Sequence, residues 1–176
     1  EDAGAKVVYR SIDIRDEESM GSLLAELRNE LGPIRGLIHG AGVLADRKIE
    51  DKTNEQFKQV YSTKVDGLQA LLLGAQDDDL KIIALFSSFT GRYGRTGQVD
   101  YAAANEVLNK LAQCESQRRP NCRVVSINWG PWNGGMVNPG LKTLFEQEGV
   151  GLIEPQAGPD HLVRELSIAA NGPVEV

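Results

Sequence analysis

The clearest indication of the fold lies in residues 81–105, KIIALFSSFTGRYGRTGQVDYAAAN. It opens with an apolar run, residues 81–88, that has the length and composition of a strand buried on both faces by flanking helices. It ends inside residues 98–117, which we predict to form a helix. A buried strand that leads into a helix is the repeating unit of a parallel α/β sheet.

The same alternation of strand and helix runs along the rest of the chain. Thr53 and Gln56 stand in position for a capping box at the start of a helix. Strands are also predicted at residues 6–12, 34–39 and 123–130, helices at residues 16–31, 53–73 and 155–169, and the start of a closing strand at residues 173–176. The pattern predicts an α/β fold, a doubly wound parallel sheet with helices on both faces.

The composition excludes several classes of protein. The 176 residues are one domain's worth of chain, and the net charge of −6 with scattered basic residues argues against nucleic acid as a partner. No apolar run approaches the roughly 20 residues of a membrane helix, so we expect a cytoplasmic protein without membrane contact. The cysteines, Cys114 and Cys122, fit neither a metal site nor a disulfide framework, and we expect no metal.

The polar residues that follow the strands suggest a chemistry. Ligands of parallel sheets bind at the carboxyl ends of the strands, where Ser88 ends the apolar run. Tyr101 and Asn105 share one face of the next helix, and Lys64 lies on the preceding one. A serine can hold a carbonyl oxygen, and an ammonium can lower the pKa of a phenol that donates a proton. Each residue alone is more often a packing, capping or solvated side chain, so the hypothesis of carbonyl reduction depends on the set.

This set resembles the ketoreductase domain of multifunctional polyketide and polyunsaturated fatty acid synthases, a branch of the short-chain dehydrogenase/reductase superfamily. Most of the superfamily places Lys four residues after Tyr, whereas the synthase branch resembles an exchange, YxxxN with an upstream Lys, as in YAAAN and Lys64 here. The motifs DIRD (13–16), HGAG (39–42) and NWGPW (128–132) are similar to family motifs in the same order, although Gly40 stands where the family usually has Ala.

The resemblance implies a reaction and a set of site residues. The reaction is NADPH-dependent reduction of a 3-oxoacyl thioester, held by phosphopantetheine on an acyl carrier protein, to a 3-hydroxyacyl thioester. Tyr101 would donate the proton and Ser88 would bind the carbonyl oxygen. Lys64 would lower the Tyr101 pKa and hold the nicotinamide ribose, and Asn105 would support a proton relay. The implied cofactor-binding residues are Asp13, Ile14, His39, Gly40, Ala41, Gly42, Lys64, Tyr101, Gly130 and Pro131, and the substrate-binding residues are Asp46, Tyr93, Gln98 and Met136.

Two further features follow from the resemblance. Leu44-Ala45-Asp46 keeps the last residue of an LDD motif that the family associates with 3R products, and Tyr93 stands where a Trp goes with the opposite hand, so 3R is favoured. Residues 134–151 resemble the mobile lid over the acyl chain, and Gly residues at its ends suit such motion. An ordinary surface helix is the alternative interpretation of this segment.

No GxGxxG motif follows a first strand here, and in the family that phosphate-binding motif lies upstream. We therefore interpret residues 1–176 as one partial ketoreductase domain, the C-terminal portion of a Rossmann-like sheet without its first βαβ unit. We expect it to need the upstream half of the same polypeptide for stability and activity. Two alternatives stay open: a free-standing short-chain reductase of small ketones, and a non-catalytic, structural reductase-like domain of a synthase.

Overall fold

The structure, a computed structural model, describes residues 4–135, 137 and 139–176. Its described strands form one parallel sheet in the order β1-β2-β3. The strands are β1 (Gly36–His39), β2 (Ile82–Ser88) and β3 (Arg123–Trp129). β2 lies in the centre and pairs with β1 and β3 in register at its first residue, where Ile82 faces Gly36 and Arg123. The predicted parallel sheet is confirmed.

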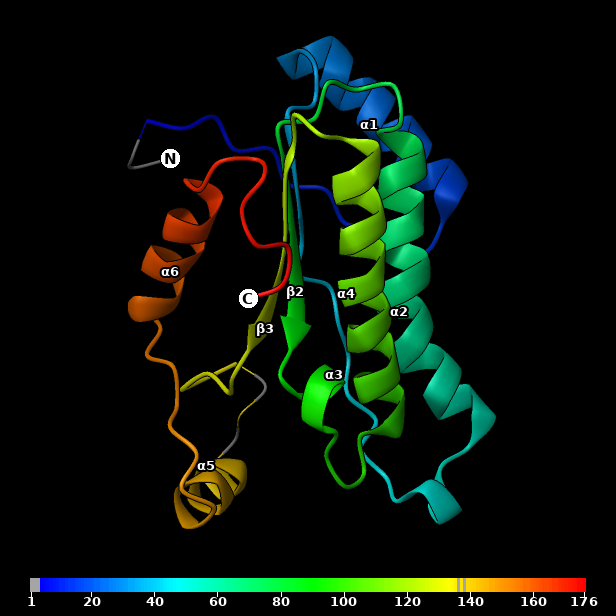
Figure 1. Cartoon of the computed structure of the whole chain (residues 1–176). Coiled ribbons are helices and arrows are strands. Elements are labelled where there is room, and N and C mark those ends of the chain that lie inside the picture. Colours follow the sequence, from blue (N-terminus) through cyan, green and yellow to red (C-terminus); the bar gives the residue numbers. More distant parts are fainter. Residues whose placement is uncertain (1–3, 136, 138) are drawn as a thin grey trace.

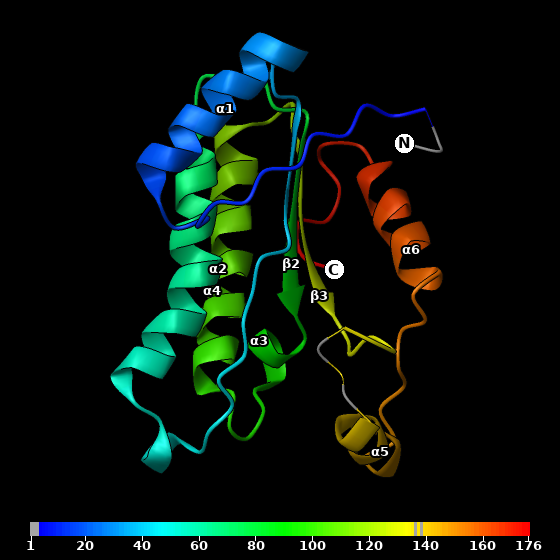
Figure 2. The same cartoon turned by 180° about the vertical axis from the view of Figure 1, so that it is seen from behind.

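Helices cover both faces of this sheet (Figures 1 and 2). One face carries α1 (Glu17–Leu31), α2 (Asn54–Gly74) and α4 (Val99–Arg118), and the other carries α6 (Ala157–Leu166). The short helices α3 (Thr90–Tyr93) and α5 (Pro139–Gln147) lie toward the carboxyl ends of the strands, and the 3-10 helix η1 (Ile49–Asp51) precedes α2. The predicted α/β class with helices on both faces is therefore also confirmed.

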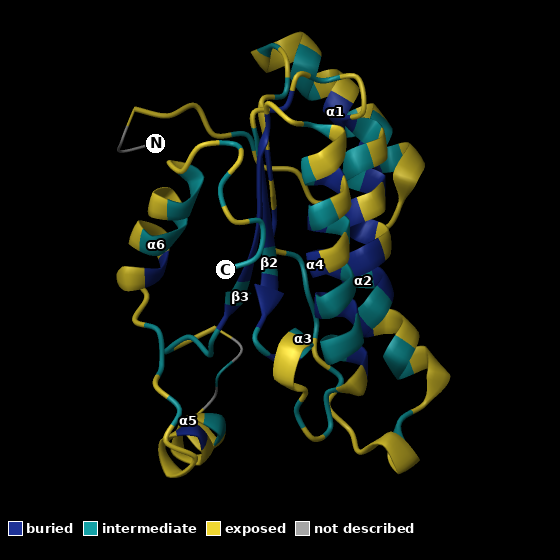
Figure 3. Cartoon of the chain, viewed as in Figure 1, coloured by how far each residue is buried: buried dark blue, intermediate teal, exposed yellow. Residues whose placement is uncertain are grey.

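Alternation along β2 divides the core into two layers. Ile83 and Leu85 pack with Leu68 of α2 and Leu108 of α4 in the larger cluster. Ala84 and Phe86 point to the opposite face, where they pack in a cluster that also contains Val125, Ile127, Leu162 and Leu166. Successive side chains of a strand point to opposite faces, so the apolar run predicted from the sequence buries both sets. Figure 3 shows that β2 and β3 are largely buried.

Local hydrogen bonds fix where α2 begins. Thr53 Oγ1 accepts from the backbone N–H of Gln56 at 3.2 Å, and Gln56 Oε1 accepts from the backbone N–H of Thr53 at 3.1 Å. This reciprocal pair is the predicted capping box. It sets the register of α2, and with it the position of Lys64 near the middle of the helix.

Residues 6–12 do not form the predicted strand. The segment runs as extended coil (Figure 2). Tyr9 is 83% exposed, and ion pairs of Lys6 and Arg10 with glutamates tether the segment to α1. A strand is stabilised by hydrogen bonds to a neighbouring strand, and none pairs with this segment in the part of the chain that the structure describes. β-branched and aromatic content alone was therefore insufficient.

The chain ends beside β3. The backbone N–H groups of Ser126 and Asn128 each donate at 2.7 Å, to the carbonyls of Val174 and Val176. Ser126 and Glu175 form a parallel bridge. The predicted closing strand is thus present as a single bridge on the outer edge of β3.

Candidate active site

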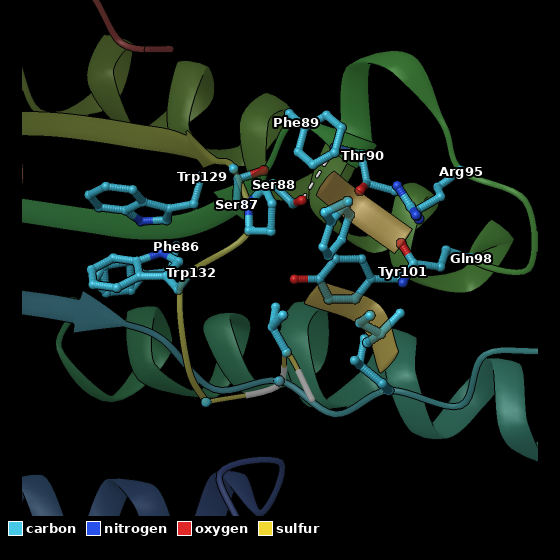
Figure 4. A pocket seen from close by; sticks show the side chains of 18 of the residues that line it. Phe86, Ser87, Ser88, Phe89, Thr90, Arg95, Gln98, Tyr101, Trp129 and Trp132 are labelled. Carbon is cyan, nitrogen blue, oxygen red and sulfur yellow. Dashed lines mark hydrogen bonds between the residues drawn. The ribbon is translucent and has the colours of Figure 1, made fainter. Parts of the chain in front are cut away.

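A pocket of about 490 Å³ opens at the carboxyl ends of β2 and β3. This is the edge at which parallel sheets bind ligands. Figure 4 shows its wall built from the end of β2, the segment between β2 and α4, and the end of β3. The predicted site residues that line it are Gly40, Gly42, Lys64, Ser88, Gln98, Tyr101, Gly130 and Pro131.

Lys64 and Tyr101 meet at this pocket from different helices. The ammonium nitrogen of Lys64 lies 5.3 Å from the centre of the Tyr101 ring and donates to the Phe86 carbonyl at 2.9 Å. Burial lowers the pKa of Lys64 to about 8, because water solvates an ammonium better than the protein interior does. Lys64 therefore still carries most of its charge at neutral pH, next to the phenol.

Tyr101 points its phenol oxygen into the pocket (Figure 4). Burial raises its pKa above the usual value of a tyrosine, neighbouring Asn105 and Ser88 act in the opposite direction, and the negative charge of Asp46 raises it further. The net direction is opposite to the lowering that we expected from Lys64, because burial outweighs the neighbours. The phenol is consequently protonated at neutral pH, which is the form that can donate a proton.

Ser88 and Asn105 flank the phenol from β2 and α4. Ser88 Oγ accepts from the backbone N–H of Thr90 at 3.2 Å, which orients the hydroxyl (Figure 4). Asn105 is fully buried and donates from Nδ2 to the Tyr101 carbonyl at 2.8 Å. Its Oδ1 is buried without a hydrogen-bond partner among the described residues. Buried acceptors of this kind are usually satisfied by protein or water, so Oδ1 suits a bound water.

His39 lies behind the pocket and is not part of its lining. The side chain is buried, and Nε2 lies 2.8 Å from the Lys64 carbonyl. A carbonyl only accepts, so Nε2 carries the hydrogen. Burial lowers the pKa of His39 to about 4, and the ring is neutral at pH 7. His39 therefore fastens β1 to α2 at the residue that carries the ammonium.

The HGAG turn needs its glycines because side chains crowd it. A Cβ on Gly40 would lie 3.1 Å from the Phe86 ring, and a Cβ on Gly42 would lie 3.1 Å from Lys64 Cε. Ala41 between them is half-buried and outside the pocket lining. Gly130 and Pro131 line the pocket from the end of β3. The two strand ends together form a narrow cradle beside Lys64 and Tyr101.

Asp13 and Ile14, predicted for the adenine side, lie outside the pocket lining. Asp13 pairs with Arg15 at 2.6 Å, and hydrogen bonds from Arg15 lower the Asp13 pKa to about 2. Ile14 packs against Gly67 of α2, where an added Cβ would lie only 2.9 Å from Ile14 Cγ2. The structure thus places Asp13 just before α1 and Ile14 against α2, and their role stays a prediction.

Of the residues predicted to bind the substrate, Gln98 lines the pocket and Tyr93 does not. Gln98 lines the pocket and donates from Nε2 to Asp46 Oδ2 at 2.9 Å, which holds the exposed Asp46 beside Gln98. Tyr93 is 84% exposed on α3 and is not part of the lining. Met136 lies outside the described residues. The structure therefore brings together Asp46 and Gln98 but not Tyr93.

Arg95 and Phe145 line the pocket and were not among the predicted site residues, although Phe145 lies in the segment predicted to form the lid. The Arg95 guanidinium lies 4.5 Å from the centre of the Phe145 ring, and it pairs with Glu148 at 3.1 Å. Phe145 is the buried residue of α5, a helix flanked by Gly135 and Gly149 at φ 61° and 70°. The amphipathic pattern of residues 141–145 was a signal for Phe145, whereas nothing local marked Arg95.

Neither a metal site nor a membrane-spanning helix is seen in the described ranges, residues 4–135, 137 and 139–176. No group of three His, Cys, Asp or Glu side chains there could hold a metal ion. None of the helices in those ranges combines the length and the apolar character that crossing a membrane requires.

Comparison with known proteins identifies the family. Residues 1–134 match the family model described as KR domain. The chain belongs to the ketoreductase (KR) domain family. It is 40% identical over 174 residues to a polyunsaturated fatty acid synthase polypeptide of Thraustochytrium sp., a match that covers 98% of this chain and 6% of that protein. It is also 36% identical over 139 residues to the polyketide synthase PksL of Bacillus subtilis, covering 76% and 3%.

Solved ketoreductases have the same fold. A ketoreductase domain from the bacillaene assembly line gives a TM-score of 0.87 at 31% identity over 99% of this KR chain and 43% of that chain. An N-terminal ketoreductase from the macrolactin assembly line gives 0.86 at 28% identity over 99% and 34%. The resemblance to synthase ketoreductases and the Rossmann-like fold are therefore confirmed. Domains of this family are oxidoreductases that use nicotinamide cofactors, and these curated relatives are parts of large synthases, of which this chain spans a small fraction.

Proposed function

We propose that this chain is the catalytic, C-terminal portion of a ketoreductase domain that reduces a 3-oxoacyl thioester to a 3-hydroxyacyl thioester. The substrate is held by phosphopantetheine on an acyl carrier protein, NADPH is the hydride donor, and the 3R product is favoured. The observation that carries this proposal is the meeting of Lys64, Ser88 and Tyr101 at one pocket, from two helices and a strand end. The relatives named as synthases support the carrier-bound substrate.

The residues of the pocket divide the work as follows. Ser88 holds the ketone oxygen, and the bound nicotinamide supplies the hydride. Tyr101 transfers the proton of its phenol to the oxygen of the substrate as negative charge develops there. The Lys64 ammonium, 5.3 Å from the ring centre, stabilises the phenolate that remains. Asn105 Oδ1 holds a water through which the phenol regains its proton.

The strand ends fit a nicotinamide cofactor. Gly40 and Gly42 carry no side chain beside Phe86 and Lys64, which leaves their backbone open to a ligand, and Gly130 and Pro131 line the same pocket. Lys64 lies beside both Gly42 and Tyr101, and its ammonium would hold the nicotinamide ribose. NADPH and the adenine-side roles of Asp13 and Ile14 are proposed from the resemblance to the family.

The 3R preference draws support from the rim of the pocket. Gln98 holds Asp46 at 2.9 Å, so the Leu44-Ala45-Asp46 segment is fixed beside the start of α4. Leu44 lines the same pocket as Tyr101. A fixed wall at this place can present one face of the ketone to the hydride.

We propose further that the upstream half of the same polypeptide completes the domain. The outer edge of β1 is unpaired among the described residues, and Ile38 on that strand is 55% exposed. A strand and helix placed there would cover both. We use "completed domain" for this chain joined to that upstream half.

The decisive experiment is Tyr101→Phe in the completed domain, which removes only the phenol oxygen. We expect turnover of a 3-oxoacyl thioester, followed by NADPH oxidation, to fall by about 10³-fold, since a positioned general acid contributes roughly 10²–10⁴. Tyr9→Phe removes the same atom from an exposed tyrosine and is the matched control.

Each alternative predicts a different result. Unchanged turnover in Tyr101→Phe would disprove the mechanism. Reduction of small free ketones but not of carrier-bound thioesters would favour a free-standing reductase. Absence of turnover in the unmodified completed domain would favour a non-catalytic domain, against which the presence of Lys64, Ser88, Tyr101 and Asn105 argues.

A further inference from the structure

A buried ion pair lies directly beside the reacting tyrosine. Lys52 Nζ is 2.6 Å from Asp100 Oδ2, and the two side chains are 3% and 1% exposed. Asp100 belongs to the first turn of α4 and immediately precedes Tyr101. Its other oxygen, Oδ1, accepts the backbone N–H of Tyr101 at 2.9 Å. One carboxylate therefore connects the lysine to the backbone of the proton donor.

The same lysine holds a second segment. Lys52 Nζ also donates to the Ala45 carbonyl at 2.8 Å, in the segment of residues 44–47 that we call the rim loop. The rim loop contacts the approach to α4 at two further points. Arg47 N–H donates to the Gly97 carbonyl at 3.0 Å, and Gln98 donates to Asp46 at 2.9 Å. Leu44 of the rim loop and Gln98 line the pocket with Tyr101.

A contribution to folding stability does not by itself explain a buried ion pair such as Lys52 and Asp100. Desolvation of two charges costs about as much as their attraction returns, and apolar replacements of buried pairs are often neutral or stabilising. What an ion pair adds is direction, because its hydrogen bonds have a fixed geometry. Here these hydrogen bonds hold the rim loop in a fixed position relative to Tyr101.

We propose that Lys52 and Asp100 are a positioning pair that sets the rim loop against Tyr101 and so decides which face of the ketone is reduced. This inference rests on the proposed function of the pocket. The pair does not touch the substrate, and it acts through Tyr101, Leu44 and Gln98. If the pair is broken, the ketone can bind in either orientation, and the phenol is less well aligned with its oxygen.

The test uses Lys52→Met and Asp100→Asn in the completed domain, with a 3-oxoacyl thioester as the probe and chiral separation of the product. We expect each variant to lower kcat by about tenfold to a hundredfold, since small misplacements of a reacting group have effects of this size. KM should change by less than about threefold, because no group that binds the substrate is lost. The share of the minor stereoisomer should rise about fivefold or more.

Two further variants separate positioning from folding. Lys48→Met removes an exposed lysine just beyond the rim loop, and this control should behave as the unmodified domain. Lys52→Met combined with Asp100→Leu removes both charges and leaves no unpaired ion, so it should retain its melting temperature even if a single variant does not. A double variant that melts normally but has low kcat and a mixed product supports the proposal.

Other outcomes overturn it. A double variant with normal melting, normal kcat and the original product would show that the pair only stabilises the fold. Single variants that fold but match Lys48→Met in kcat and product would lead to the same conclusion. If the unmodified completed domain reduces no thioester, the proposed function itself fails, and this inference fails with it.

Discussion

The two walls of the pocket differ in how firmly they are held. The scaffold wall carries Lys64, Ser88 and Tyr101 on α2, β2 and α4, elements that pack on one another over the larger core cluster. The cover wall is α5, which presents Leu141 and Phe145 to the pocket and is mostly exposed (Figure 3). The groups that we propose for the chemistry thus stand on the buried scaffold, and we propose that the exposed cover moves as a lid.

Buried polar contacts explain the firmness of the scaffold wall. Asn109 of α4 accepts from Ser126 Oγ at 2.7 Å and donates to Asn128 Oδ1 at 3.0 Å, both on β3. Ser87 Oγ lies 3.1 Å from the Asn105 carbonyl. Buried polar groups are costly to leave unpaired, so these bonds favour one position of α4 on the sheet. Because Tyr101 and Asn105 lie on α4, their positions relative to the sheet are fixed by the same hydrogen bonds.

The largest effect should come from the unpaired outer edge of β1, in the sheet that supports the scaffold wall. We expect residues 1–176 alone to show no cooperative melting and no NADPH turnover, whereas the completed domain shows both. The reason is that the unpaired outer edge of β1 and the exposed Ile38 leave the sheet without a neighbour in the described residues. A cooperative melt with turnover from residues 1–176 would show that the scaffold wall folds and functions without the upstream half of the polypeptide.

The next effect tests the charge on the scaffold wall. Lys64→Met in the completed domain should lower kcat by roughly 10²-fold or more, because the developing phenolate loses its cation. In the unmodified domain kcat should fall as the pH rises through about 8, the pKa to which burial lowers Lys64, because the ammonium is lost above it. Lys64→Arg should move this fall to higher pH, since a guanidinium keeps its charge.

The control for Lys64 is Lys58→Met, an exposed lysine on the same helix. It should keep both the rate and the pH profile of the unmodified domain. A Lys64→Met variant with an unchanged rate would remove Lys64 from the mechanism and leave the scaffold wall with only a structural role.

The sequence predicted those elements whose signals are local. The capping box of Thr53 and Gln56 and the apolar run of β2 each place an element within a residue or two of where it lies. The strand at residues 6–12 was wrong because strand formation depends on a partner elsewhere in the chain. Local pattern thus fixed the helices better than the sheet edge.

The site was less accessible to sequence reasoning than the fold. The residue types suggested Lys64 as the cation beside Tyr101, but only the family resemblance supported that pairing, since nothing in a helix pattern says that two helices meet. The pairs Lys52–Asp100 and Arg95–Phe145 join residues about fifty positions apart, so neither has a local signature. Asp100 alone looks like an ordinary acidic residue at the start of a helix.

A third prediction concerns how the stability of the fold depends on pH through His39, which connects β1 to α2 behind the scaffold wall. Burial lowers the His39 pKa from 6.5 to about 4, so the unfolded chain binds a proton at a pH where the folded chain does not. The neutral, buried His39 stabilises the folded chain fully above pH 6.5. As the pH falls toward 4 this stabilisation is lost, and the free energy of unfolding decreases by about 3 kcal/mol. Denaturant unfolding of the completed domain should therefore show a steeper loss with acid than His39→Gln does.

His161→Gln removes the other histidine, which lies on α6, and is the matched control for the substitution itself. Equal slopes in His39→Gln and the unmodified domain would mean that His39 is accessible to protons in the folded state. The fastening of β1 to α2 at Lys64 would then be looser than the 2.8 Å contact indicates.

The smallest effect should come from the cover wall. Phe145→Ala removes the ring on which Arg95 stacks at 4.5 Å, and α5 loses its buried anchor. We expect KM for the acyl thioester to rise about tenfold while kcat changes by less than about threefold, because ground-state and transition-state binding are weakened alike. Leu144→Ala, at a half-exposed position of the same helix, is the control and should change neither. A fall in kcat as large as that of Lys64→Met would mean that α5 orders the reacting groups as well as the substrate, and the distinction between the two walls would no longer hold.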